Sequence, residues 1–268
     1  MVVNQKEIEE FLVSLREPLR EAIMPYFGKS TISRKGEGVN DVLTEADAAA
    51  QEVIVGAIKK QFPDHGIISE EQSENYKPEA PYQWFIDPID GTRNFASGVP
   101  LFGSMAALVV DGNVEVAMNY LPATDEFYIA KRNGGVTKNG IPAHCSSPKD
   151  FKSSYGIGPV GAGSGKIIKF HKAMMEVEPA GVWMNSIASL AISSSYLADG
   201  RRDWFYSKGS KSWDYMTSAL IIKESGCVTL NADGGDWKAG DLSIFACAPE
   251  LEKTVRQIIE VRKRLDTE

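Results

Sequence analysis

The hydrophobic pattern at the start of the chain is helical. Between residues 5 and 27 an apolar side chain recurs every three or four residues, which predicts a helix with one buried stripe. The stripe comprises Ile8, Leu12, Leu15, Leu19 and Ile23. We expect Asn4 to cap the start of this helix, Gly28 to end it and Pro18 to kink it.

A second helical pattern covers residues 44–62, with a stripe made of Val53, Ile54, Ala57, Ile58 and Phe62. Thr44 is the expected N-cap. Asp47 falls in the first turn, where a carboxylate interacts favourably with the helix dipole. This position predicts that Asp47 lies at a helix start and outside the core.

The pattern changes to strands after residue 64. Apolar runs predict strands at residues 65–70, 83–89, 104–120 and 126–131. The third run is expected to fold into a hairpin at Asp111-Gly112-Asn113, because these residues favour a tight turn. This half of the chain therefore reads as helices packed on an antiparallel sheet.

The C-terminal half mixes both patterns. Helices are expected at residues 186–198, 213–226 and 249–265, and strands at 201–206, 227–231 and 242–248. Helices and strands without regular βαβ alternation predict an α+β fold. The turn-rich segment 138–150 is the expected boundary between two subdomains, residues 1–145 with most of the candidate ligands and residues 146–268 with the remainder.

Composition excludes several classes of protein. With 268 residues and 43% hydrophobic content, the chain can form a sizeable core. The net charge of −7, without a cluster of Lys and Arg, predicts no nucleic-acid partner. No apolar run approaches the ~20 residues of a membrane span. Three cysteines without CxxC spacing and a charged N-terminal segment predict a cytoplasmic protein.

The chemistry is concentrated in the sequence DPIDGT, residues 87–92. Pro88 favours an extended backbone at Asp87, so Asp87 is expected to end a strand, with Asp90 one turn further on and facing the same point. Two converging carboxylates without a basic neighbour favour a hard cation, and Mg²⁺ also accepts backbone carbonyls such as that of Ile89. The alternative interpretation is a simple turn, since Asp, Pro and Gly all favour turns.

The residues that follow add an anion site. Gly91 lets the backbone approach a ligand closely, and the amides of Gly91 and Thr92 would point outward if a helix begins there. The Thr92 hydroxyl can orient a water molecule. A metal next to a phosphate site predicts phosphoryl chemistry by metal-activated water.

Further carboxylates lie close to predicted element ends. Glu70 and Glu71 follow the strand at residues 65–70, and Asp214 follows Trp213 at the start of a helix. Each of these alone is explained as a solvated charge or an N-cap. Together with Asp87 and Asp90 they match a known pattern.

These residues resemble the inositol monophosphatase family of lithium-sensitive, magnesium-dependent phosphatases. Four motifs occur in the family's order, and the resemblance covers nearly the whole chain. They are DVLTEAD (41–47), SEE (69–71), DPIDGTRNF (87–95) and WDYMTSALIIKESG (213–226). The resemblance implies a layered αβαβα sandwich, as in fructose-1,6-bisphosphatase, and a homodimer.

The resemblance also implies a role for each matching residue. The first metal would be held by Glu70, Asp87 and the Ile89 carbonyl, and the second by Asp87, Asp90 and Asp214. A third, looser ion would share Glu70. Asp47 and Thr92 would orient the attacking water, and the Gly91 and Thr92 amides would hold the phosphate. Two to three Mg²⁺ ions and inhibition by Li⁺ follow from the family.

The chain departs from the family on the substrate side. Inositol phosphatases commonly carry a Glu seven residues before the WD aspartate, and here that position is Ser207. Lys208 and Lys211 add positive charge nearby, either for a second anion on the substrate or as exposed lysines. Ser189 lies in a segment that lacks the family's Arg and Gly, next to a bulkier Leu190.

The expected function is therefore a Mg²⁺-dependent phosphatase acting on a small phosphate ester, inositol monophosphate or a related sugar or alcohol phosphate. Fructose 1,6-bisphosphate, 3′-phosphoadenosine 5′-phosphate and histidinol phosphate remain alternative substrates. A regulatory binding protein of the transcription machinery is the alternative from another class.

Overall fold

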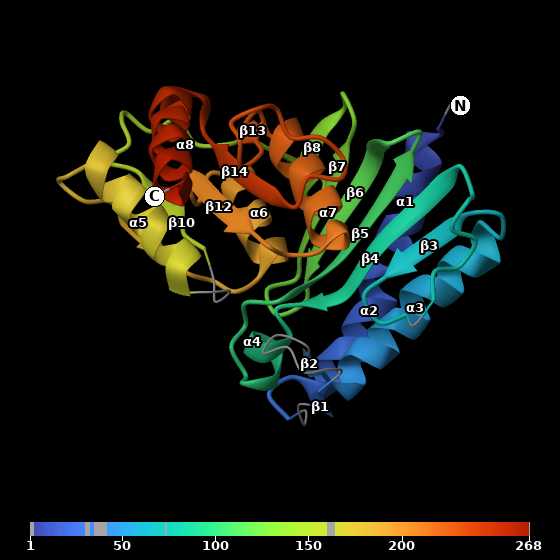
Figure 1. The fold of residues 1–268 in the computed structure, drawn as a ribbon. Helices are drawn as coiled ribbons and strands as arrows, with labels where there is room; N and C mark the ends of the chain where they lie inside the picture. The colour runs from blue at the N-terminus through green and yellow to red at the C-terminus, as the bar shows by residue number, and fades with distance from the viewer. Residues whose placement is uncertain (1–2, 30–32, 35–41, 73, 160–163, 268) are drawn as a thin grey trace.

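The computed structural model describes residues 3–29, 33–34, 42–72, 74–159 and 164–267. Two β-sheets alternate with three layers of helices across the molecule (Figure 1). Helices cover both faces of each sheet, so the strands are apolar along most of their length rather than at alternate positions. This arrangement confirms the α+β fold and the layer order that the family resemblance implied.

The larger sheet has seven strands. All neighbouring pairs are antiparallel except β3 and β4, which are parallel. In spatial order the strands are β3 (Gly66–Ser69), β4 (Tyr82–Asp90), β5 (Gly103–Val110), β6 (Asn113–Leu121), β7 (Glu126–Lys131), β8 (Gly135–Lys138) and β9 (Ile141–Ala143).

The predicted hairpin between β5 and β6 is confirmed. Asp111 and Gly112 have φ angles of 49° and 73°, which a two-residue turn between antiparallel strands requires. The strands β8 and β9 were not predicted. They are three or four residues long and lie among Gly, Asn and Pro residues, so their composition resembles that of a loop.

The smaller sheet has five strands in the order β11, β10, β12, β14 and β13. The pairs that involve β10 are parallel and the other two pairs are antiparallel. Their bounds are β10 (Tyr155–Ile157), β11 (Trp183–Asn185), β12 (Trp204–Lys208), β13 (Val228–Leu230) and β14 (Ser243–Cys247). The last three strands were predicted, whereas β10 and β11 were not. A separate pair, β1 (Ser33–Arg34) and β2 (Val42–Leu43), is antiparallel.

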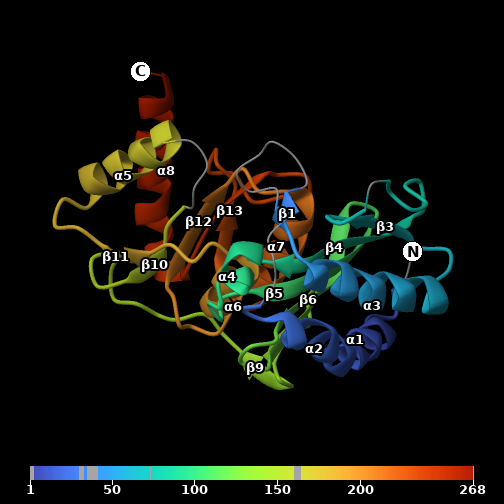
Figure 2. The same ribbon diagram turned by 90° about the horizontal axis from the view of Figure 1, so that it is seen from below.

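Three helices cover the outer face of the larger sheet (Figure 2). They are α1 (Gln5–Ser14), α2 (Arg16–Ile23) and α3 (Glu45–Gln61), with a 3₁₀ turn at Met24–Tyr26 after α2. The predicted kink is a break at Leu15 instead, three residues before Pro18. Pro18 has no N–H for the Ser14 carbonyl and its ring clashes with that carbonyl, which explains where the helix is interrupted.

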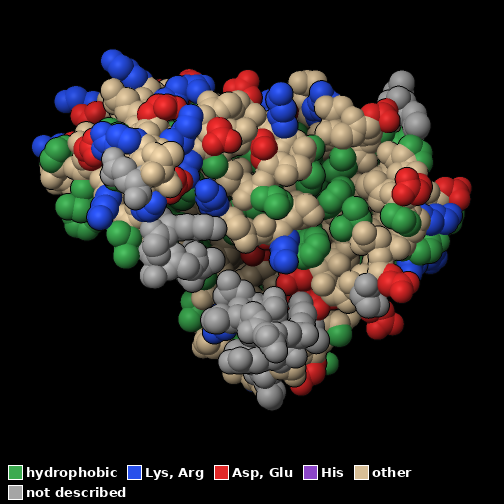
Figure 3. Space-filling model, viewed as in Figure 1, with side chains coloured by type: hydrophobic (Ala, Val, Ile, Leu, Met, Phe, Trp, Pro, Cys, Tyr) green, Lys and Arg blue, Asp and Glu red, His purple; other side chains and the backbone are tan. Residues whose placement is uncertain are grey.

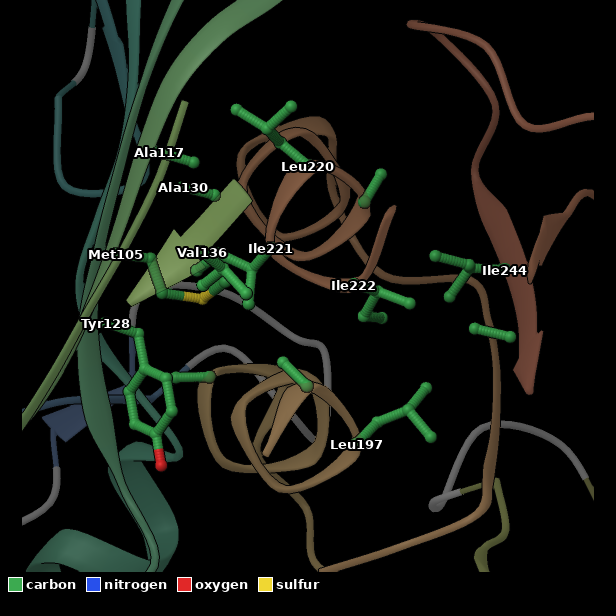
Figure 4. Packing of buried hydrophobic residues seen from close by; sticks show 14 of the residues in the cluster. Met105, Ala117, Tyr128, Ala130, Val136, Leu197, Leu220, Ile221, Ile222 and Ile244 are labelled. Atoms are coloured by element: carbon green, nitrogen blue, oxygen red, sulfur yellow. The ribbon is translucent and has the colours of Figure 1, made fainter. Parts of the chain in front are cut away.

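The middle layer holds α6 (Leu190–Ala198) and α7 (Ser212–Glu224) between the sheets. Figure 4 shows Met105 of the larger sheet pointing toward Ile221 of α7, while Leu197 of α6 lies on the side of its helix that faces the smaller sheet. Ile244 of β14 closes this cluster from the smaller sheet. Because α7 is buried from both sides, its N-terminus is fixed relative to both sheets.

The last layer consists of α5 (Ser164–Val177) and α8 (Glu252–Thr267), preceded by a 3₁₀ turn at Pro249–Leu251. The residues of β12 alternate between faces, with Phe205 toward the middle layer and Trp204 and Tyr206 toward α5 and α8. The sheets occupy residues 66–143 and 155–247. The division into subdomains 1–145 and 146–268 stays a prediction.

Candidate metal centre

Three buried aspartates meet where the larger sheet faces α7. Asp87 and Asp90 belong to β4 and Asp214 to α7, and one carboxylate oxygen of each lies within 4.8 Å of the others. The strand does not end at Asp87, as the sequence predicted, but continues to Asp90 with a register shift between the two residues. Residues three apart in a regular strand face opposite sides, so this irregularity lets both carboxylates face one point.

Asp90 is fixed by the first turn of α6. Its Oδ2 accepts hydrogen bonds from the Ser189 hydroxyl at 2.5 Å and from the Ala191 N–H at 2.7 Å. Ser189 also caps α6, since its Oγ accepts a hydrogen bond from the Ile192 N–H at 3.2 Å. Ser189, predicted to bind substrate, therefore contacts a candidate metal ligand directly.

Asp214 is held by its own helix. It is the third residue of α7, and its Oδ2 accepts a hydrogen bond from the Lys211 N–H at 3.0 Å. The carboxylate of Asp214 therefore has two roles: it bonds to the backbone at the start of α7, and it contributes negative charge to the cluster. An acidic residue in the first turn of an otherwise apolar helix is a signal that can be seen in the sequence.

The electrostatics of the cluster are unfavourable without a cation. Burial raises the pKa of Asp87 well above its ordinary value, and the charges of Glu70, Asp214 and Asp90 raise it further. Burial likewise raises the pKa of Asp214, with Asp90 as the next cause. The pKa of Asp90 rises to about 6 through burial, although its bonds to Ser189 and Ala191 act in the opposite direction.

These residues fit a divalent cation. The buried Asp87 Oδ1 has no hydrogen-bond partner within the part of the chain that the structure describes. A buried polar atom without a partner costs about 1–3 kcal/mol, and several buried carboxylates of one sign cost more. All the donors are hard oxygens, which Mg²⁺ and Ca²⁺ prefer.

The other predicted ligands adjoin this cluster. Glu70 follows β3, and its backbone N–H donates to the Ile86 carbonyl at 3.1 Å, next to Asp87 on β4. The carbonyl of Ile89 accepts a hydrogen bond from the Thr92 hydroxyl at 3.0 Å. Both Glu70 and Ile89 line the same cavity as the three aspartates.

Gly91 begins the short helix α4 (Thr92–Ala96) in the left-handed region, at φ 87°. A Cβ there would lie 2.9 Å from the Leu101 carbonyl and 3.1 Å from the Ser189 Cβ. Only glycine fits this turn without displacing its neighbours. The prediction that Gly91 serves a close backbone approach thus has a second reason, the packing of α4 against the start of α6.

Asp47 lies at a helix start as predicted, but the expectation that it lies outside the core is wrong, since it is 1% exposed. Its Oδ2 accepts hydrogen bonds from the N–H and the hydroxyl of Thr44 at 2.7 and 2.6 Å. Its charge is the least of the causes that raise the pKa of Asp87, and Asp47 is not among the described residues that line the cavity. Asp41, the first residue of that motif, lies outside the described residues.

A cavity of about 260 Å³ opens beside the carboxylates. Ser207 and Lys208 of β12 line it, together with Lys211 from the loop before α7. Figure 3 shows red carboxylate atoms inside a hollow with blue Lys or Arg atoms at its edge. The Ser207 hydroxyl is 3.0 Å from the hydroxyl of the buried Tyr215, so its hydrogen bond joins β12 to α7.

Sequence reasoning missed several groups at the site. The Ala191 N–H is a backbone donor, which leaves no trace in residue type. Tyr215 follows the WD pair but reads as a core residue. Arg93 lines the cavity. It belongs to the motif DPIDGTRNF, and its positive charge next to the anion site could have identified it.

Comparison with known proteins agrees with this geometry. The model of the inositol monophosphatase family matches residues 4–264. A Haemophilus influenzae protein named Nus factor SuhB is 32% identical over 213 residues, 79% of each chain. An inositol-1-monophosphatase of Rhizobium meliloti is 29% identical over 225 residues, 84% of this chain and 85% of the relative.

Solved structures share the fold. An IMPase from Thermotoga maritima superposes with a TM-score of 0.85 at 26% identity, covering 97% of this chain and 99% of its own. An inositol monophosphatase from Anabaena (Nostoc) gives a TM-score of 0.80 at 21% identity and covers 98% and 97% of the two chains. The match over residues 4–264 is decisive, and the chain belongs to the inositol monophosphatase family.

Proposed function

We propose that this chain is a Mg²⁺-dependent phosphomonoesterase for a small phosphate ester, inositol monophosphate or a related sugar or alcohol phosphate. The observation that carries the proposal is the buried cluster of Asp87, Asp90 and Asp214 beside a cavity. Membership of the family supports phosphatase chemistry. In the reaction a water oxygen bonds to phosphorus, the bond from phosphorus to the leaving oxygen breaks, and the alcohol takes a proton.

The cation sites follow the same residues. We assign Glu70, Asp87 and the Ile89 carbonyl to one ion and Asp87, Asp90 and Asp214 to another, with a third ion near Glu70. When bound, Mg²⁺ would neutralise the charge that develops on the phosphate and lower the pKa of water. Inhibition by Li⁺ is expected on the same basis.

The protein's own groups orient the reactants. Asp47 and Thr92 are assigned to hold the attacking water, and the amides of Gly91 and Thr92 to receive the phosphate. Ser189 acts by holding the carboxylate of Asp90 in place, through the 2.5 Å hydrogen bond. Rigid donors of this kind need little reorganisation during the reaction.

The test is phosphate release with Mg²⁺ from inositol 1-phosphate, fructose 1,6-bisphosphate, 3′-phosphoadenosine 5′-phosphate and histidinol phosphate. We expect turnover of at least one ester that stops in excess chelator and returns with added Mg²⁺. Undiminished turnover in chelator would contradict the metal assignment. Absence of turnover on this panel, with Mg²⁺ bound, would favour the second candidate function.

That second candidate is a regulatory protein of the transcription machinery. Its support is the name Nus factor SuhB borne by a relative that is 32% identical. Recovery of a specific transcription protein by both the wild type and an Asp87→Asn variant would support it, because binding would then not need the metal centre. Capture of no such protein by either form would exclude it.

Assembly and location are part of the proposal. The chain is expected to form a homodimer, which light scattering of the purified protein measures. A cytoplasmic location is expected from the sequence. No helix in the described ranges is both long and apolar enough to cross a membrane.

A further inference from the structure

The charges that line the cavity are divided by sign. The four carboxylates among its described lining residues are Glu70, Asp87, Asp90 and Asp214. All of them belong to the proposed metal centre. The lining therefore offers no described carboxylate to accept hydrogen bonds from the hydroxyls of a sugar or an inositol ring.

The cationic residues approach the cavity from two sides. Arg93 comes from α4 next to the larger sheet, whereas Lys208 and Lys211 come from the smaller sheet and the start of α7. Lys208 ends β12, where it pairs with Ser243 of β14. Lys211 precedes Asp214 by three residues, and the bond from its N–H to Asp214 fixes its backbone beside the metal centre.

The loop that carries the two lysines is anchored. The Tyr215 hydroxyl accepts a hydrogen bond from the Ser210 N–H at 3.2 Å and lies 3.0 Å from the Ser207 hydroxyl. Tyr215 itself is fully buried. The Tyr215 hydroxyl thus holds both ends of the segment 207–210, which carries Lys208, and Lys211 follows that segment directly.

Part of the lining is apolar. Ile157 of β10, Leu190 of α6 and Phe205 of β12 contribute there. Apolar side chains do not replace the hydrogen bonds that water makes to a polyhydroxylated ring, and such a ring would lose them on binding. An anion placed near the two lysines gains a charge-assisted interaction instead.

We propose that the substrate carries a second anionic group, a phosphate or a carboxylate, on its leaving alcohol, and that Lys208 and Lys211 bind that group. The proposal rests on the phosphatase function above and narrows its substrate class. Two ammonium groups can bind either a phosphate or a carboxylate. Two pairs of esters, one differing by a carboxylate and the other by a phosphate, show which of the two groups is bound.

The first measurement compares kcat/KM within two ester pairs. In 2-phosphoglycerate a carboxylate replaces one CH₂OH group of glycerol 2-phosphate, and fructose 1,6-bisphosphate adds a phosphate to fructose 1-phosphate. We expect the ester with the second anion to be preferred about ten-fold, and less so at high ionic strength. Preference within one pair alone identifies carboxylate or phosphate as the group bound.

The variants test the lysines themselves. The double variant K208Q/K211Q is expected to bring the ratio of kcat/KM within the preferred pair close to one, and K208R/K211R to retain the preference. Lys223, exposed in the last turn of α7, supplies the control K223Q, which should keep the wild-type ratio. An unchanged preference in K208Q/K211Q would overturn the assignment to these lysines.

Binding gives a readout independent of turnover. In an Asp47→Asn background with Mg²⁺, isothermal titration calorimetry should show about ten-fold tighter binding of the ester with the second anion. Equal affinities within both pairs, with turnover of all esters in the wild type, would overturn the second-anion proposal and leave the phosphatase intact. Selective binding without turnover of any ester would support the anion site and refute the phosphatase function.

Discussion

Carboxylates shielded from water occur in two regions of this molecule, fully buried in one and half-buried in the other, and their pKa values shift in opposite directions. In the metal centre Asp87, Asp90 and Asp214 are surrounded by one another, and burial raises the pKa of each. In the second region, which we call the ionic cluster, Glu126 and Asp199 lie between Arg201 and Lys138. Burial is only partial for Glu126 and Asp199, but it acts to raise the pKa of the carboxylates in both regions, so the neighbouring charges decide the direction of the net shift.

The ionic cluster is complete within the protein. Arg201 Nη2 lies 2.6 Å from a Glu126 carboxylate oxygen and 2.8 Å from one of Asp199, and the Tyr128 hydroxyl donates to Asp199 at 2.8 Å. Burial alone would raise the pKa of Asp199, but the bonds from Arg201, Tyr128 and Lys138 leave it below its ordinary value. The same balance lowers the pKa of Glu126.

The comparison separates structure from function. The ionic cluster joins β7 and β8 to the end of α6 and needs no additional ion, so removing one of its charges would leave another without a partner. In the metal centre the carboxylates repel one another, and a bound cation would offset this repulsion. Buried acids whose pKa is raised by like charges mark a site with a function, whereas matched acids mark a structural contact.

The substitution with the largest expected effect on the metal centre is Asp90→Asn. The amide oxygen can still accept the bonds from Ser189 and Ala191, but one ligand charge is lost. We expect phosphatase turnover to fall about a thousand-fold, the order expected when several kcal/mol of charge stabilisation is removed. Steady-state phosphate release measures this, and Asp236→Asn on the exposed loop is the matched control. Turnover within ten-fold of the wild type would show that Asp90 holds no essential ion.

The second largest effect is expected on thermal stability when the metal is removed. Mg²⁺ at a hundred times its Kd is expected to stabilise the native protein by about 2.7 kcal/mol. Thermal unfolding with Mg²⁺ and with chelator measures this shift. Asp90→Asn should reduce the shift, and its metal-free form should exceed the metal-free wild type in stability at pH 8, because the buried charge is gone. An equal shift in both proteins would place the stabilising ion elsewhere.

The sequence predicted one of these regions and missed the other. The backbone preferences of Pro88 and Gly91 pointed to converging carboxylates at Asp87 and Asp90. Asp214 was joined to them only by the resemblance of the WD motif to the inositol monophosphatase family. The ionic cluster is formed by four residues from separate elements with no common spacing.

Fold prediction had the same limit. Long apolar runs such as β5 and α7 were recognised, whereas β10 and β11 are held by pairing with strands far away in the sequence. The burial of Asp47 was missed for a related reason. The sequence around a helix start does not reveal which distant parts of the chain pack over it.

The ionic cluster can be broken from its centre. Arg201→Met keeps a long side chain but removes the guanidinium, whose carbon lies 3.7 Å from the centre of the Tyr196 ring and whose charge both acids share. We expect a loss of about 2 kcal/mol in the free energy of unfolding, less than for a fully buried pair because the Arg201 side chain is 33% exposed. Urea denaturation measures it. The variant should keep the Mg²⁺-induced shift, and its loss would mean that the two regions are coupled.

The control for this loss is an exposed ion pair. Arg256 Nη2 lies 2.7 Å from Glu252 one helical turn away, and both side chains are more than a third exposed. Arg256→Met should cost about 0.5 kcal/mol or less. Equal losses for Arg201→Met and Arg256→Met would show that burial adds nothing to the ionic cluster.

The smallest expected effect is a pH dependence. Because Glu126 and Asp199 have a lowered pKa in the native state, their stabilisation is present above their ordinary values of 4.5 and 3.8 and is lost as pH falls through the native values. In Arg201→Met the guanidinium no longer lowers the pKa of the two acids, so we expect burial to raise both values. As pH falls, the acids of the variant then take up protons first, which removes their unfavourable charge while the acids of the wild type are still ionised and paired. The difference in unfolding free energy should therefore shrink by about 1 kcal/mol between pH 7 and pH 5. Urea denaturation at both pH values measures this, and a difference that grows on acidification would reverse the sign we assign to the ionic cluster.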